Sequence, residues 1–82
     1  MYDLEVTIKR GASRPVLIRR IETPERVQQI VESFHAAWGL PFPDRLAPRG
    51  ELPLLEQVAH CGAYLHDDDA SRVVVKRSPA HP

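Results

Sequence analysis

The stretch ETPERVQQIVESFHAAWGL (residues 22–40) decides the fold of this 82-residue chain. Its apolar residues recur at spacings of three and four, which is typical of one apolar stripe along an α-helix. Thr23 is a suitable N-cap, and Pro24 is well tolerated at the first helical position. Gly39 predicts that the helix ends there in a left-handed conformation. The stripe supplies most of the predicted core and consists of Val27, Ile30, Val31, Phe34 and Trp38.

The residues before this helix predict a β-hairpin. Residues 2–10 (YDLEVTIKR) alternate apolar and polar side chains, which is the period of a half-buried strand. After a short polar tip at residues 11–14 (GASR), residues 15–21 (PVLIRRI) predict the second strand. Two sets of apolar residues compete for its inner face, Val16 with Ile18 and Leu17 with Ile21. Either a bulge lies in this strand or both of its faces are partly covered.

The residues after the helix divide into a connector, a short element and a second hairpin. Residues 41–53 hold four prolines and a glycine, so we expect an extended surface connector without regular structure. Residues 53–62 (PLLEQVAHCG) favour a short helix, although a strand is the competing interpretation. Residues 63–77 (AYLHDDDASRVVVKR) predict a hairpin whose polar turn is DDDAS, and residues 78–82 predict a frayed tail.

These elements predict a small two-layer α+β domain spanning residues 1–77. The sheet is expected to be antiparallel and built from two β-hairpins in the order ββ-α-(α)-ββ. One amphipathic helix would pack on one face of that sheet. The pattern leaves the order of the strands in the sheet open.

The stretch HCGAYLHDDD (residues 60–69) concentrates the side chains that could bind a metal or carry out catalysis. His60 and Cys61 are adjacent and therefore cannot share a face of a helix or strand, which disfavours a zinc site. Cys61 is predicted near a helix C-terminus, where the dipole disfavours a thiolate, so we expect a buried structural cysteine. His35 is expected at the boundary of the core. The sequence therefore predicts no catalytic residue, no metal ligand and no cofactor.

Composition and targeting signals favour a cytoplasmic protein. The single cysteine cannot form an internal disulfide, which suits a reducing compartment. The first residues do not resemble a signal peptide, and nothing approaches the 18 or more apolar residues that a membrane span needs, so no membrane partner is expected. The arginine-rich, lysine-poor composition suggests a bacterial or phage origin.

The zero net charge of the chain conceals two basic ends and an acidic middle. Residues 1–20 hold five basic residues against two acidic ones, and residues 72–82 hold three basic residues and no acidic ones. Residues 21–71 hold nine acidic residues against three basic ones. Surfaces of this kind attract partners of complementary charge. The predicted partner-binding residues are Arg10, Arg14, Arg19 and Arg20 of the first hairpin, Phe42 of the connector, and Asp67, Asp68 and Asp69 of the second turn.

We therefore interpret the chain as a small non-enzymatic protein-binding module that acts as a regulator, an inhibitor or an assembly component. The same surfaces are compatible with a homodimer. The alternative is binding to a nucleic-acid backbone by the basic first hairpin, because lysine and arginine side chains neutralise phosphates. Two features weigh against this alternative: the net charge is zero, and few aromatic side chains are available to stack on bases.

Overall fold

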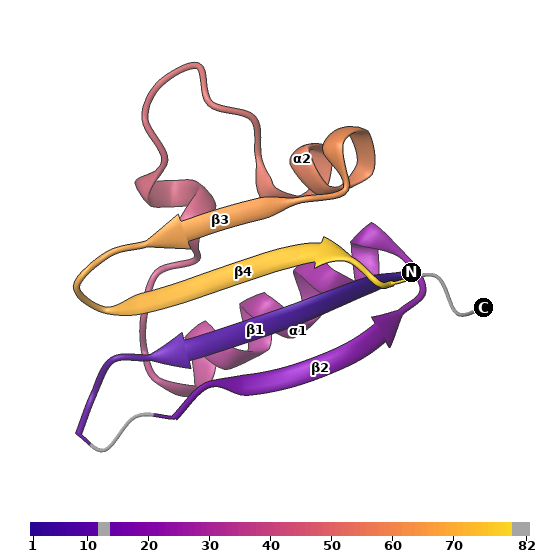
Figure 1. Cartoon of the computed structure of the whole chain (residues 1–82). Helices are drawn as coiled ribbons and strands as arrows, with labels where there is room; N and C mark the ends of the chain where they lie inside the picture. The colour runs from indigo at the N-terminus through magenta and orange to yellow at the C-terminus, as the bar shows by residue number, and fades with distance from the viewer. Residues whose placement is uncertain (12–13, 80–82) are drawn as a thin grey trace.

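The computed structural model describes residues 1–11 and 14–79, and it confirms the predicted α+β architecture (Figure 1). Residues 12 and 13 at the predicted hairpin tip, and residues 80–82 of the predicted tail, lie outside the described residues. The elements are β1 (Tyr2–Ile8), β2 (Val16–Ile21), α1 (Pro24–Ala37), the single-turn 3-10 helix η1 (Pro43–Leu46), α2 (Leu54–Cys61), β3 (Tyr64–Asp67) and β4 (Ser71–Arg77).

The four strands form one antiparallel sheet in the order β2-β1-β4-β3. The first and last strands of the chain are thus the central pair, with a register that runs from Tyr2 opposite Arg77 to Ile8 opposite Ser71. The pairing continues beyond β4, because Ser78 of the predicted tail donates its backbone N–H to the Met1 carbonyl at 2.9 Å. The two basic ends of the sequence are therefore neighbours in the fold.

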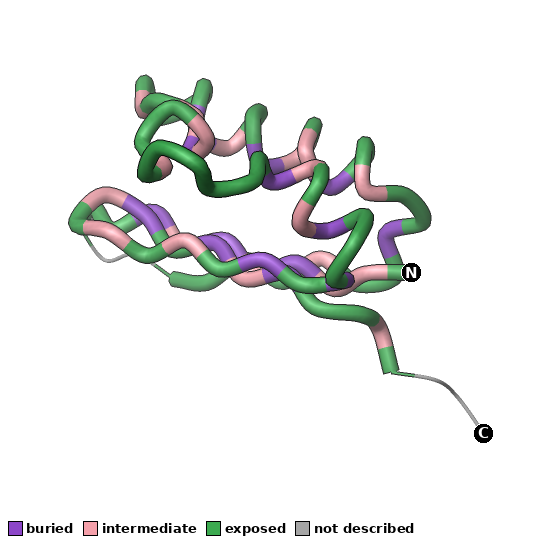
Figure 2. Tube along the Cα trace, turned by 90° about the horizontal axis from the view of Figure 1, so that it is seen from above, coloured by how far each residue is buried: buried purple, intermediate pink, exposed green. Residues whose placement is uncertain are grey.

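Both α-helices pack on the same face of the sheet, and the opposite face stays open (Figure 2). Strand alternation explains this division, because every second residue of β1 and β4 points toward the helices. Burying these alternate side chains contributes roughly 25 cal/mol for each Å² of apolar surface removed from water. The buried hydrophobic residues are Leu4, Val6, Ile8, Ile21, Val27, Val31, Leu54, Val58, Tyr64, Val73 and Val75.

The apolar stripe of α1 is only partly buried, which corrects the predicted core. Val27 and Val31 are fully buried, whereas Ile30 and Phe34 are partly buried and Trp38 is 49% exposed. The stripe is wider than the contact that the sheet offers, and the sheet ends at β2. The side of α1 that carries Ile30, Phe34 and Trp38 therefore extends past the edge of the sheet, where fewer side chains cover it.

A β-bulge in β2 resolves the competition for its inner face. Leu4 lies opposite Ile18, but Tyr2 lies opposite Ile21, so the β2 side carries one extra residue at Arg19–Arg20. Arg20 adopts a φ of 60°, and its backbone N–H donates to the Asp3 carboxylate at 3.1 Å. The extra residue returns Ile21 to the buried face, as predicted for a bulge.

The predicted helix boundaries are confirmed at α1. The Thr23 hydroxyl accepts the backbone N–H of Arg26 at 3.2 Å, which caps the first turn. Gly39 follows the helix with a φ of 67°, a conformation that favours glycine. Leu40 then folds back, donating its backbone N–H to the His35 carbonyl at 2.8 Å.

The short element predicted at residues 53–62 is a helix rather than a strand. Pro53 precedes α2, Gly62 ends it with a φ of 70°, and its buried residues are Leu54 and Val58. The connector before it was predicted to have no regular structure. This prediction is wrong in part, because Pro43–Leu46 form the 3-10 turn η1. This turn places the Asp44 carboxylate 2.8 Å from the backbone N–H of Leu54, where it satisfies a donor at the start of α2. Within the described residues, no helix has the length and apolarity that crossing a membrane requires.

Candidate functional site

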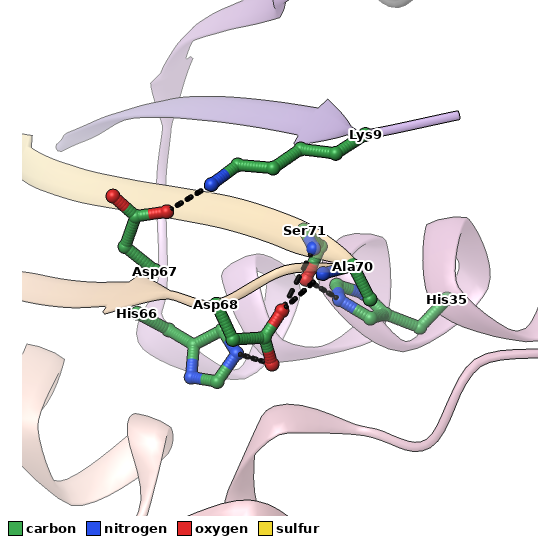
Figure 3. A network of polar contacts seen from close by, with 7 residues as sticks. All are labelled: Lys9, His35, His66, Asp67, Asp68, Ala70 and Ser71. Atoms are coloured by element: carbon green, nitrogen blue, oxygen red, sulfur yellow. Dashed lines mark hydrogen bonds and ion pairs between the residues drawn. The ribbon is translucent and has the colours of Figure 1, made fainter. Parts of the chain in front are cut away.

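The acidic turn between β3 and β4 is held together by Asp68 (Figure 3). One carboxylate oxygen accepts the backbone N–H groups of Ala70 and Ser71 at 2.8 and 2.9 Å, and the other lies 2.8 Å from His66 Nε2. Burial raises the pKa of Asp68, but the two backbone donors and His66 outweigh this effect and hold the pKa below its ordinary value. Asp68 therefore has a structural role in the turn.

Asp67 is also engaged within the molecule. Its carboxylate accepts a hydrogen bond from Lys9 Nζ at 2.5 Å across the open face of the sheet, and this bond holds the pKa of Asp67 below its ordinary value (Figure 3). Asp69 is exposed. Two of the three aspartates that were predicted to bind a partner therefore already have partners inside the fold.

His35 is buried rather than at the boundary of the core. Its Nδ1 lies 2.9 Å from the Val31 carbonyl, and its Nε2 lies 2.9 Å from the Ser71 hydroxyl (Figure 3). Because a carbonyl can only accept, Nδ1 donates to it, and in the tautomer that carries its proton on Nδ1, Nε2 is the acceptor of the Ser71 hydroxyl. Both residues are 2% exposed, so this serine–histidine pair joins α1 to β4 and is closed to a substrate.

The remaining candidates for metal binding or catalysis are dispersed. Within residues 1–11 and 14–79, no group of three or more histidine, cysteine or acidic side chains is placed to hold a metal ion. Cys61 is exposed at the end of α2, which corrects its expected burial.

A hollow between the connector and β3 contains the nearest arrangement to a reaction centre. Its lining includes Asp44, Glu51, Tyr64, His66 and Asp68. Burial raises the pKa of the Tyr64 hydroxyl, and the negative charges of Asp44 and Glu51 raise it further. The phenol therefore remains protonated and is a poor general base. His66 is already bonded to Asp68, and the residues that line this hollow include no serine, threonine, cysteine or lysine.

The arginines of the first hairpin gather along one edge of the sheet. Arg10, Arg14, Arg19 and Arg20 are all exposed on or beside β2, and Arg26 from the first turns of α1 borders the same edge. Among the described residues, none of the five forms an ion pair with an acidic side chain. The sequence prediction included the first four and missed Arg26, which only the packing of α1 beside β2 brings to this place.

The basic residues of β4 have a different setting. Lys76 lies opposite Asp3 of β1, and Arg72 lies opposite Asp67 of β3. Opposite charges at such cross-strand positions neutralise each other. The open face is therefore mixed in charge, whereas five arginines lie together at the β2 edge.

Apolar side chains lie beside these arginines in two adjoining hollows between β2 and α1. One hollow is lined by Val16, Phe34 and Trp38 together with Arg10 and Arg14. The other is lined by Ile18 and Ile30 together with Arg19, Arg20 and Arg26. We call the five apolar residues the β2 groove: Val16, Ile18, Ile30, Phe34 and Trp38.

The sequence treated three of the groove residues as core, because the periodicity of α1 does not show where the sheet ends. In the sequence, the width of the apolar stripe was the one sign that part of it would stay exposed. Phe42, predicted as a contact on the connector, is partly buried and packs against the core. Comparisons of this chain with protein-family models, with curated proteins and with solved structures found no match.

Proposed function

We propose that this protein is a small non-enzymatic protein-binding module that works as a regulator, an inhibitor or an assembly component from the β2 edge of its sheet. The observation that supports this most is that exposed apolar side chains and five arginines that form no ion pair among the described residues lie at one edge of the sheet. We expect it to act in the cytoplasm, because its single cysteine suits a reducing compartment.

The composition of this edge resembles that of a protein interface. Val16 is 41% exposed, Leu17 is 57% exposed and Trp38 is 49% exposed, all close to the arginines. Interface centres are enriched in aromatic residues and arginine, and tryptophan and arginine dominate the residues whose truncation weakens binding most. An enclosing partner would remove the apolar surface from water and would supply acidic groups to the guanidinium groups.

The acidic turn has a smaller part in this proposal than the sequence suggested. Asp67 and Asp68 are occupied by Lys9 and by the turn itself, so Asp69 is the residue there that remains for a partner. Replacing all three aspartates with basic residues would disrupt the turn as well as change the charge of the surface. A test of this region should therefore change Asp69 alone.

Binding to a nucleic-acid backbone is the second candidate, and five arginines along one edge favour it. Such binding weakens steeply with salt as condensed counterions are released. The apolar groove between the arginines favours protein instead, because phosphates make no use of it. Titration of the protein with generic DNA and RNA at low and at physiological salt separates the candidates, and tight, salt-sensitive binding would favour the nucleic acid.

Affinity capture with matched variants tests the proposed function. The first bait carries Arg10→Glu, Arg14→Glu, Arg19→Glu and Arg20→Glu. The control bait carries Arg45→Glu and Arg49→Glu, which reverse two exposed arginines of the connector. We expect both variants to keep the circular dichroism spectrum of the unchanged protein. We also expect a protein partner that the unchanged and control baits retain and the first bait loses. Equal recovery of every protein by all three baits would refute the use of this edge.

A further inference from the structure

We propose that β2 accepts an extended acidic segment of a partner protein as a fifth strand, with the apolar side chains of that segment in the β2 groove. This inference rests on the proposed function and specifies how the partner is held. Extended segments add to free sheet edges through backbone hydrogen bonds, while alternate side chains enter pockets beside the edge.

The backbone of β2 has groups available for such pairing. Lys9 donates its backbone N–H to the Ala70 carbonyl on the β4 side. Because backbone groups alternate in direction along a strand, the N–H and C=O groups of odd-numbered β1 residues point toward β4, and those of even-numbered residues point toward β2. Val16 and Ile18 lie opposite even-numbered residues of β1 and therefore bond to β1. The N–H and C=O of Leu17, between them, point away from the sheet.

The two edges of the sheet are not equally free. Beside β3 (Tyr64–Asp67) lies the connector, whose residues line a hollow together with those of the strand. Beyond β2 no element of the described chain follows, as Figure 1 shows. The bulge at Arg19–Arg20 interrupts β2, and bulges limit pairing along an edge. The added strand would therefore pair with Val16–Arg19, roughly one short strand of four residues.

The side chains of β2 define the chemistry of the added strand. In an antiparallel pair, opposite residues share a face of the sheet. Partner residues opposite Val16 and Ile18 would point toward Ile30 and Phe34 and should be apolar. Partner residues opposite Leu17 and Arg19 would point to the open face.

Charge selects the remaining positions of the segment. Arg19 and its four neighbouring arginines form no ion pair among the described residues, although Asp3 lies beside Arg19, so positive charge outnumbers negative charge at this edge. The residues that alternate with the apolar ones should therefore be acidic. A second copy of this chain is a poorer occupant, because pairing β2 with another β2 would bring arginines against arginines and like charges on adjacent strands repel.

A synthetic peptide provides the probe. The peptide alternates glutamate and valine over seven residues and has blocked ends. Trp38 is the single tryptophan of the chain and lines the groove, so its fluorescence reports occupancy directly. We expect a saturable blue shift of the emission. We expect affinity to fall at least tenfold for the same peptide with three consecutive N-methylated amides, and for a lysine–valine peptide. Arg19→Glu should also weaken binding of the acidic peptide, whereas Arg49→Glu should not.

Several outcomes would overturn the inference. Equal binding of the N-methylated peptide would show that backbone pairing is not used, and equal binding of the lysine–valine peptide would show that charge does not select the segment. The absence of any shift at millimolar peptide would remove the fifth strand. A stable dimer in light scattering that Arg19→Glu strengthens would identify a second copy as the occupant.

The same peptide separates this inference from the proposed function. A captured partner that depends on the arginines but is not displaced by excess acidic peptide leaves the proposed function standing and refutes strand addition. Capture that is insensitive to the arginines refutes the proposed function itself.

Discussion

The buried pair of His35 and Ser71 offers the sharpest test of how this domain is held together. Replacing His35 with leucine keeps similar volume but removes the acceptor of the Ser71 hydroxyl, which is 2% exposed. A buried hydroxyl left without a partner costs about 1–3 kcal/mol. The Val31 carbonyl loses its contact with Nδ1 but stays satisfied, because in an α-helix it also accepts the backbone N–H four residues later.

The magnitude is measurable in a domain of this size. Total stability should be about 4–12 kcal/mol, from roughly 0.05–0.15 kcal/mol per residue. A loss of about 2 kcal/mol would lower the urea midpoint by about 0.7–2 M, since small proteins have m-values of about 1–3 kcal/mol/M. Far-UV circular dichroism should follow the transition, because it reports helix and sheet directly. Ser33→Ala, which removes an exposed serine bonded within α1, serves as the control and should change little.

The double variant decides whether the hydrogen bond is the cause. Ser71→Ala alone leaves Nε2 without its partner and should cost a similar amount. In His35→Leu with Ser71→Ala, neither polar group remains unpaired, so stability should return to within about 0.5–1 kcal/mol of the unchanged protein. Losses that simply add in the double variant would refute the reasoning, because they would show that packing alone sets the cost.

Substitutions at three further positions test the turns and the open face. Asp68→Ala should cost about 1–2 kcal/mol in urea unfolding, because two backbone donors lose their acceptor. Because folding lowers the pKa of Asp68, its carboxylate stabilises the fold above about pH 4, and this stabilisation is lost as the pH falls. Asp68→Asn should therefore make the free energy of unfolding less dependent on pH in this range. An unchanged dependence would contradict the role given to Asp68. Gly62→Ala should lower the melting temperature by about 4–8 °C or more, since a φ of 70° disfavours alanine and the added methyl would collide with the Arg77 side chain; an unchanged melt would show that this turn tolerates a side chain. Lys9→Met should leave the melting temperature nearly unchanged, because its bond to Asp67 is exposed to solvent, and a large loss would show that this bond stabilises the sheet more than exposed pairs usually do.

Local sequence patterns were sufficient to predict the helices and strands of this protein and most of their ends. Period-two alternation predicted the strands, and Thr23, Pro24 and Gly39 predicted the limits of α1, because these signals act between residues that are close in the chain. The break in alternation at residues 15–21 left a bulge and a strand covered on both faces as alternatives, and the structure has the bulge. The four predicted arginines are exposed, as are Asp67 and Asp69. The partners of Asp67 and Asp68 inside the fold were not predicted.

Tertiary structure alone decided which surfaces are left for function. Periodicity shows that a stripe of α1 is apolar, but only the position of the sheet beneath the helix selects Val27 and Val31 for burial and leaves Trp38 half exposed. His35 could be buried because β4 brings the Ser71 hydroxyl to it from 36 positions away. The strand order, which places β2 at an edge, depends on pairings between the two ends of the chain. No local pattern encodes such pairings, because their free energy comes from contacts that exist only once the sheet has assembled.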